Sequence, residues 1–179
     1  PHSRNCGKIK KIKVVLKMKG RKRMYKHCDS DDCYISLHDC RAEKMSFDKG
    51  ILSFTFPDGF WITQQHSLNR SENTVLTSSS QVDFTIIGEE ICGIEISIFR
   101  KKRSGTVIRE DWEPLNFINA VNAGDFEIEF ITQYKSYQSF LFKCWVWFNK
   151  EPYHSECEII LHSGRVLYRW NDLRYDCCW

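Results

Sequence analysis

The densest group of residues able to bind a metal ion lies between His27 and Cys40. Zn²⁺ prefers thiolate and imidazole ligands, and structural sites hold four of them in a tetrahedron. The segment supplies four such side chains, which are Cys28, Cys33, His38 and Cys40. Their spacing lacks the close cysteine pair of common zinc motifs. In a regular strand Cys33 would also lie on the face opposite His38 and Cys40. The alternative is two buried thiols beside a solvated acidic turn. We therefore expect no cofactor, and zinc is the one candidate if a cofactor is bound.

A second group lies in the basic arm, residues 1–26, which contains eleven Lys or Arg residues and no acidic residue. Alternating lysines on one face of a strand can follow nucleic-acid phosphates, where counterion release supplies the affinity. The candidate contacts are Lys11, Lys13, Lys17, Lys19, Arg21, Lys22 and Arg23. Alternatively, such lysines prevent aggregation of an edge strand, or they pair with the acidic strand face of Asp125, Glu127 and Glu129.

Residues for catalysis form no recognisable pattern. Cys144 lies in an apolar row, where burial keeps a thiol inert. His154 lies near Glu156 and Glu158, which charge pairing on an exterior face explains equally well. The sequence contains no phosphate loop, dinucleotide fingerprint, nucleophile elbow or paired metalloprotease histidines. We therefore expect that the protein is not an enzyme.

Strands must position most of these groups, because alternation of apolar and polar residues with a period of two dominates the sequence. Glycine-containing turns at residues 47–51 and 56–60 predict a three-stranded meander. Further inward faces are predicted in the strands on either side of residues 87–93. The predicted inward residues of these strands are Leu52, Phe54, Phe56, Val82, Phe84, Ile86, Ile94, Ile96 and Ile98.

Residues 126–148 give the clearest strand pattern. One predicted face of the first strand carries Phe126, Ile128, Phe130 and Tyr134, and one face of the second carries Phe140, Phe142, Cys144, Val146 and Phe148. The reverse face of the second strand carries Trp145 and Trp147. We therefore expect this strand to be central and covered on both faces, with a helix as the second cover.

One short helix is predicted over about residues 112–123. Pro114 suits its first turn, and Gly124 suits its C-terminal end. Runs of strands with one helix predict an α+β, mostly antiparallel β fold. The expected architecture is a curved sheet or open barrel of about ten strands packed on that helix.

Composition predicts one folded domain over residues 1–179, with the basic arm at 1–26 and a polar loop at 64–81. The chain is 42% hydrophobic and 14% aromatic, which is enough for a large core. No apolar run reaches the roughly 18 residues that a membrane helix needs, so we expect no membrane contact. Nine cysteines and an N-terminus without an apolar signal stretch predict reduced thiols and a cytoplasmic location.

Charge divides the chain into two unlike parts. Residues 27–179 carry 15 basic and 23 acidic side chains, so an acidic body follows the basic arm. Such a body could bind a basic protein, as an inhibitor or immunity-type protein would. We therefore expect a non-catalytic interaction domain with a protein partner. Nucleic-acid binding through the arm is the first alternative, and a small-molecule-binding barrel or an enzyme with no recognisable motif is the second.

Overall fold

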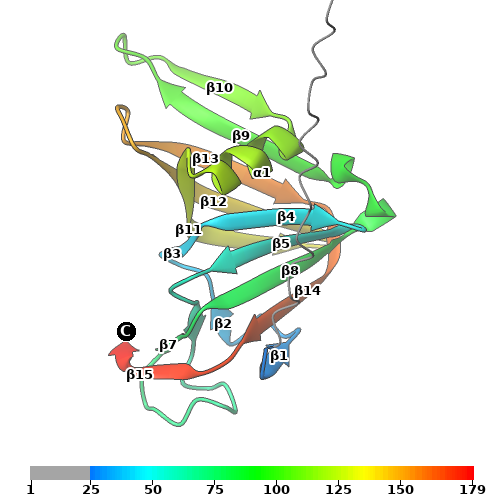
Figure 1. Cartoon of the computed structure of the whole chain (residues 1–179), viewed down its shortest axis with the longest axis vertical. Coiled ribbons are helices and arrows are strands. Elements are labelled where there is room, and N and C mark those ends of the chain that lie inside the picture. Colours follow the sequence, from blue (N-terminus) through cyan, green and yellow to red (C-terminus); the bar gives the residue numbers. More distant parts are fainter. Residues whose placement is uncertain (1–24) are drawn as a thin grey trace, which may run out of the picture.

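The computed structural model describes residues 25–179 (Figure 1). The seven candidate nucleic-acid contacts all lie outside the described residues. The described chain is mostly antiparallel β with one α-helix, as the sequence predicts. Its strands form three sheets arranged as an open rather than a closed barrel, so the expected single curved sheet of about ten strands is not found.

The first large sheet has five strands in the order β1 (His27–Asp29), β14 (Ser163–Trp170), β8 (Ser80–Ile86), β5 (Ile51–Phe56) and β4 (Lys44–Asp48). The second has six strands in the order β10 (Val107–Trp112), β9 (Ile94–Lys101), β13 (His154–Leu161), β12 (Ser139–Phe148), β11 (Phe126–Ser136) and β3 (Cys40–Ala42). The smallest joins β15 (Leu173–Cys178), β7 (Val75–Thr77), β6 (Trp61–Ile62) and β2 (Ile35–Ser36). Two 3₁₀ turns, η1 (Ile87–Glu89) and η2 (Ile91–Gly93), lead from β8 to β9.

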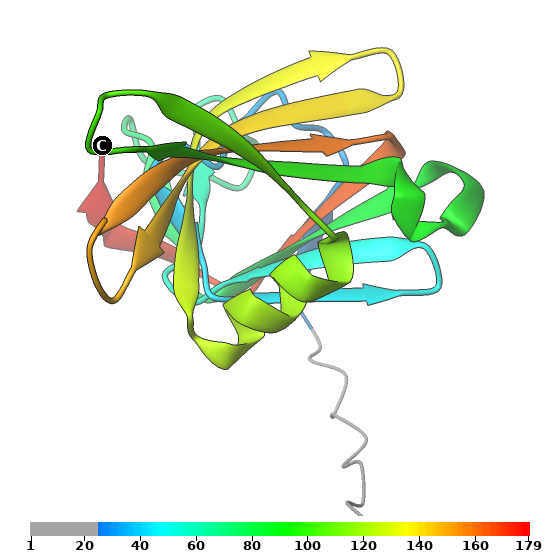
Figure 2. The ribbon, with the colours of Figure 1, turned by 90° about the horizontal axis from the view of Figure 1, so that it is seen from above.

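The ribbons of the two large sheets lie around a common interior (Figure 2). Aromatic side chains of both sheets form one core there. Phe54 of β5 packs edge-on against Phe130 of β11, with ring centroids 5.3 Å apart. Phe84 of β8 packs in the same way against Phe142 of β12, at 5.5 Å. The predicted inward residues of β5, β8, β9 and β12 are all buried except Phe148, which is half-buried, so alternation identified these faces correctly.

The helix α1 (Pro114–Ala123) confirms the predicted segment. Pro114 fixes its first turn, and Gly124 ends it in the left-handed conformation (φ 78°) that glycine adopts without a steric penalty. Phe117 packs on Phe126, with centroids 5.1 Å apart, so α1 lies on the core side of the six-stranded sheet. In residues 25–179 no helix is long and apolar enough to span a membrane.

The position of α1 corrects one prediction. Because α1 packs on the same face as Phe126, it does not cover the opposite face of β12, which carries Trp145 and Trp147. Lys143 and Glu156 on that opposite face are exposed. β12 is central, as expected, but only one of its faces belongs to the core.

A β-bulge corrects another prediction. The pairing of β11 with β12 shifts register between Phe130 and Thr132, which leaves Ile131 as an extra residue. An extra residue reverses the alternation beyond it. Gln133 therefore follows Phe130 on the inner side, whereas Tyr134 points outward and is 55% exposed. The assignment of Tyr134 to the inward face was wrong for this reason.

The predicted meander holds for two strands only. Lys49 and Gly50 form the turn between β4 and β5, both with positive φ, as a two-residue hairpin requires. At Gly59 the chain instead approaches the Thr77 backbone so closely that a Cβ would clash with the Thr77 carbonyl. The next strand, β6, therefore pairs with β7 in the smallest sheet.

The polar segment 64–81 is a loop only in its first part. It includes β7 and the start of β8, and Thr77 and Ser80 are buried there. The loop before β7 is held by Asn69, whose side-chain amide donates hydrogen bonds to the carbonyls of Ile62, Thr63 and Asn73 at 2.9–3.2 Å.

Candidate interaction surface

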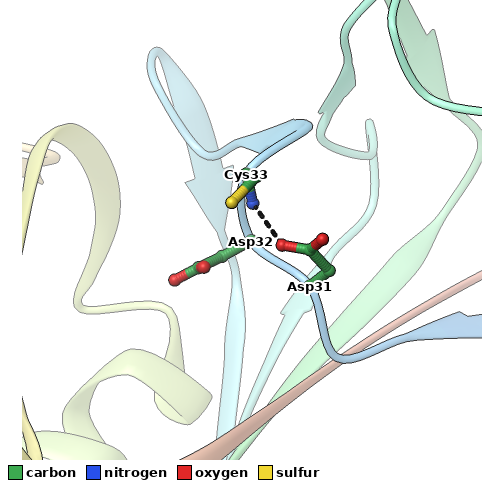
Figure 3. Close-up of side chains that lie close together, drawn as sticks. All are labelled: Asp31, Asp32 and Cys33. Atoms are coloured by element: carbon green, nitrogen blue, oxygen red, sulfur yellow. Dashed lines mark hydrogen bonds between the residues drawn. The ribbon is translucent and has the colours of Figure 1, made fainter.

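The structure places the predicted zinc ligands in different surroundings. In residues 25–179, one group brings three possible ligand atoms within 4.8 Å of one another, at Asp31, Asp32 and Cys33 (Figure 3). Its carboxylates already have partners. Asp31 Oδ1 accepts a hydrogen bond from the Cys33 backbone N–H at 2.9 Å, and the Asp32 carboxylate pairs with the Lys135 ammonium at 2.9 Å. This segment is therefore an acidic turn, and the ion pair between Asp32 and Lys135 attaches it to β11.

The remaining predicted ligands are not part of that group. Cys28 is exposed on β1, whereas Cys40 is buried on β3, where burial raises the pKa of its thiol to about 12. The His38 ring stacks on Trp179, with centroids 5.4 Å apart, and its Nδ1 lies 2.5 Å from the carbonyl oxygen of the bulge residue Ile131. Within the described chain no site brings the four predicted ligands together.

The cysteine considered as a nucleophile is a core residue. Cys144 of β12 lies directly opposite Cys157 of β13, and both side chains are buried. Burial raises the pKa of both thiols well above the ordinary value, so neither is a thiolate near neutral pH.

Two hollows open between the sheets beside the β11–β12 hairpin. They measure about 270 and 620 Å³, and Lys135 lines both. The Lys135 ammonium is held by Asp32 and lies 5.6 Å from the centroid of the Phe140 ring. The small-molecule alternative would use these hollows.

The outer face of the six-stranded sheet combines aromatic and charged side chains. We call it the tryptophan face and define it by Arg41, Phe99, Arg109, Glu127, Glu129, Lys143, Trp145, Trp147, His154, Glu156 and Glu158. Strand register places one row of these side chains across all six strands, because directly opposed residues share a face. The row runs Arg41, Glu129, Trp145, Glu156, Phe99 and Arg109.

Trp147 holds a cation from the same chain. The Arg41 guanidinium lies 4.9 Å from the centroid of the Trp147 ring. Its two terminal nitrogens lie 3.4 Å from carboxylate oxygens of Glu127 and Glu129. The Trp147 indole N–H donates a hydrogen bond to the Glu129 carboxylate. Aromatic, carboxylate and guanidinium groups therefore form one connected cluster at this end of the face.

Trp145 has a different set of neighbours. The His154 ring packs edge-on against it at 4.8 Å and also contacts Trp147 at 5.1 Å, so the histidine fixes both indoles. Glu156 lies directly opposite Trp145 on β13 and is exposed. Among the described residues Glu156 has no hydrogen-bond or ion-pair partner. A shallow hollow of about 250 Å³ lies here, and its lining includes Trp145, Glu156, Lys143 and Glu158.

The sequence itself indicates that the outer face of β12 is exposed, although β12 was predicted to be covered on both faces. Glu127 and Glu129 precede the tryptophan strand, and Glu156 and Glu158 follow it, all at alternating positions. Strands on both sides of Trp145 therefore turn carboxylates to the same face, and buried carboxylates are rare unless paired. The pattern indicates a solvent-facing surface.

Comparison with known proteins found no matching family model, curated protein or solved structure.

Proposed function

We propose that the protein is a non-catalytic interaction domain that binds a protein partner through the tryptophan face. The observation that supports this proposal is the row of aromatic and charged side chains that crosses six strands and that no other part of residues 25–179 covers. Tryptophan and arginine are enriched at the energetic centres of protein interfaces, because they combine large apolar area with directed polar groups.

The tryptophan face is also held in place before any partner arrives. Trp145 and Trp147 extend from β12, which is paired along both edges by β11 and β13. His154 packs on both rings, and Arg41 packs on Trp147. Side chains ordered in the free protein lose less conformational entropy on binding, so more of the contact energy contributes to affinity.

The size of the tryptophan face suits a protein rather than a small molecule. At the usual spacing of about 4.8 Å between strands, a row across six strands spans about 24 Å. A stable protein interface buries roughly 800 Å² on each partner, which corresponds to a patch of similar width. By contrast, the hollow beside Trp145 holds only about 250 Å³.

A retention experiment with matched variants tests this function. Wild type, the double variant Trp145→Ala/Trp147→Ala and the control Tyr175→Ala are immobilised and exposed to an extract of the source cells. Tyr175 is an exposed aromatic residue on β15, away from the tryptophan face. We expect proteins retained by wild type and by Tyr175→Ala to be lost from the double variant, with cross-links to wild type mapping to Lys143.

Two results would contradict binding through the tryptophan face. If all three proteins retain the same partners, or if cross-links map only to residues off the tryptophan face, the face does not bind them. Near-ultraviolet circular dichroism of the double variant, which retains four of the six tryptophans, establishes that its core is folded.

A further inference from the structure

We infer that the tryptophan face binds a basic polypeptide segment that places an arginine side chain on Trp145 beside Glu156. This inference rests on the proposed function, because it names the chemistry of the partner that the face binds.

The cluster at Trp147 shows what this face does with a guanidinium. Arg41 lies over the indole at 4.9 Å, and two carboxylates hold it from the neighbouring strand β11 at 3.4 Å. The electron-rich face of an indole attracts a cation, and tryptophan does so more strongly than other aromatic residues. A planar guanidinium can stack on the ring while its N–H groups reach carboxylates in the same plane.

Trp145 repeats the aromatic and carboxylate parts of that cluster. It lies two residues from Trp147 on β12, so both indoles share one face. Glu156 lies directly opposite Trp145 on β13, and no cation of the described residues pairs with this carboxylate. The nearest basic residue on β12, Lys143, has its ammonium 3.9 Å from Glu158 instead. The third component, a guanidinium, would therefore come from a partner.

The charge around Trp145 favours a cation. The adjacent hollow is lined by Glu156, Glu158 and Lys143, which together leave one negative charge. Further away, residues 27–179 carry 23 acidic against 15 basic side chains. A surface of this sign attracts basic segments over long range and speeds their association. Arginine is favoured over lysine, because only the guanidinium both stacks and donates two parallel hydrogen bonds.

The test measures binding of three labelled peptides to the full-length protein by fluorescence anisotropy. The peptides are nine residues long and alternate serine with arginine, with lysine, or with citrulline, which has the shape of arginine without its charge. We expect the arginine peptide to bind at least about tenfold more tightly than the citrulline peptide, and more tightly than the lysine peptide. Glu156→Gln and Trp145→Leu should each lower the affinity for the arginine peptide by about five- to tenfold.

A matched control separates the site from general attraction to the acidic body, residues 27–179. Asp48→Asn removes an exposed carboxylate from β4 in the five-stranded sheet, so it changes the net charge of the protein by the same amount as Glu156→Gln. The control should bind the arginine peptide as wild type does. Equal losses in Asp48→Asn and Glu156→Gln, or no loss in Glu156→Gln, would overturn the inference.

The remaining outcomes distinguish this inference from the proposed function. If partners retained by wild type are lost from the double tryptophan variant while the three peptides bind alike, the proposed function stands and the arginine assignment fails. If the variants change neither retention nor peptide binding, both fail. If sedimentation shows self-association that Glu156→Gln abolishes, and no peptide binds, the occupant is the basic segment 1–26 of a second copy and the inference of a separate partner is wrong.

Discussion

Burial and immediate neighbours decide which cysteines can react. Cys40, Cys144 and Cys157 are buried, and the low-dielectric interior disfavours their thiolates. Cys33 is exposed, yet its pKa is also raised, because its thiol donates a hydrogen bond to the Asp31 carboxylate and the charge of that carboxylate repels a thiolate. The same residue type is thus made less reactive by two different causes.

Replacing Asp31 by Asn should make Cys33 react faster with iodoacetamide. Asn keeps a side-chain oxygen for the Cys33 backbone N–H, whereas it removes the negative charge that raises the Cys33 pKa. A lower pKa increases the thiolate population near pH 7, so we expect roughly a threefold or greater rise in rate.

Mass spectrometry of the labelled peptides measures this rate, with exposed Cys28 as the internal reference. The difference between Asp31→Asn and wild type should shrink as the pH rises, because wild-type Cys33 then also becomes a thiolate. Equal rates at pH 7 would show that the Asp31 charge does not control this thiol.

The bulge in β11 determines which side chains the element turns inward. Before Ile131 the inward residues are aromatic or aliphatic, whereas after it they are Gln133 and Lys135. The shift turns Lys135 toward Asp32 on the loop that precedes β2, and the two form an ion pair. One extra residue therefore converts the second half of β11 from core strand to polar rim.

Alanine substitutions on either side of the bulge test this reversal. Phe130 is buried and contacts Phe54, Phe56 and Phe142, so Phe130→Ala should lower the free energy of unfolding by about 3–5 kcal/mol. Tyr134→Ala should lower it by less than about 1 kcal/mol, because that ring is exposed. Urea titrations measure both values. A loss at Tyr134 as large as that at Phe130 would mean that β11 has no bulge.

Elements with a long, regular pattern were predictable from the sequence, and the exceptions have identifiable causes. The helix boundaries followed from Pro114 and Gly124, and the inward faces of β5 and β8 followed from alternation. The bulge was missed because Tyr134 continues the period of Phe130 in the sequence. The smallest sheet was missed because β2 and β6 have only two residues each, too few to show a period. The zinc hypothesis relied on ligand types alone, and of its four residues only Cys33 belongs to the group of three possible ligand atoms that lie within 4.8 Å of one another in the described chain.

At the scale of the molecule, one hydrophobic cluster of the described residues joins all three sheets and the helix. The aromatic contacts cross from the five-stranded to the six-stranded sheet, so neither sheet can lose its partner without exposing large rings to water. The tryptophan face lies outside this cluster. Stability and binding therefore depend on opposite faces of the same strand, β12, which makes the two properties separable by mutation.

Phe142, which is fully buried on the core face of β12, offers a test of that separation. Its ring lies 5.1 Å from Phe130 on the same sheet and 5.5 Å from Phe84 on the opposite one. Phe142→Ala removes both contacts and leaves a cavity, so we expect a loss of about 3–5 kcal/mol. Because the shared core joins all three sheets and the helix, tryptophan fluorescence and far-ultraviolet circular dichroism should follow one coincident urea transition in the variant, as in wild type.

Trp145→Leu is the control on the reverse face of β12 and should change stability by less than about 1 kcal/mol. A loss below about 1 kcal/mol for Phe142→Ala would show that this face is not the core. Separate transitions for the two probes would show that the sheets unfold independently, since a single cooperative domain loses both signals together. The combination we expect, a large loss at Phe142 and a small one at Trp145, leaves Trp145 replaceable in the binding experiments without unfolding the protein.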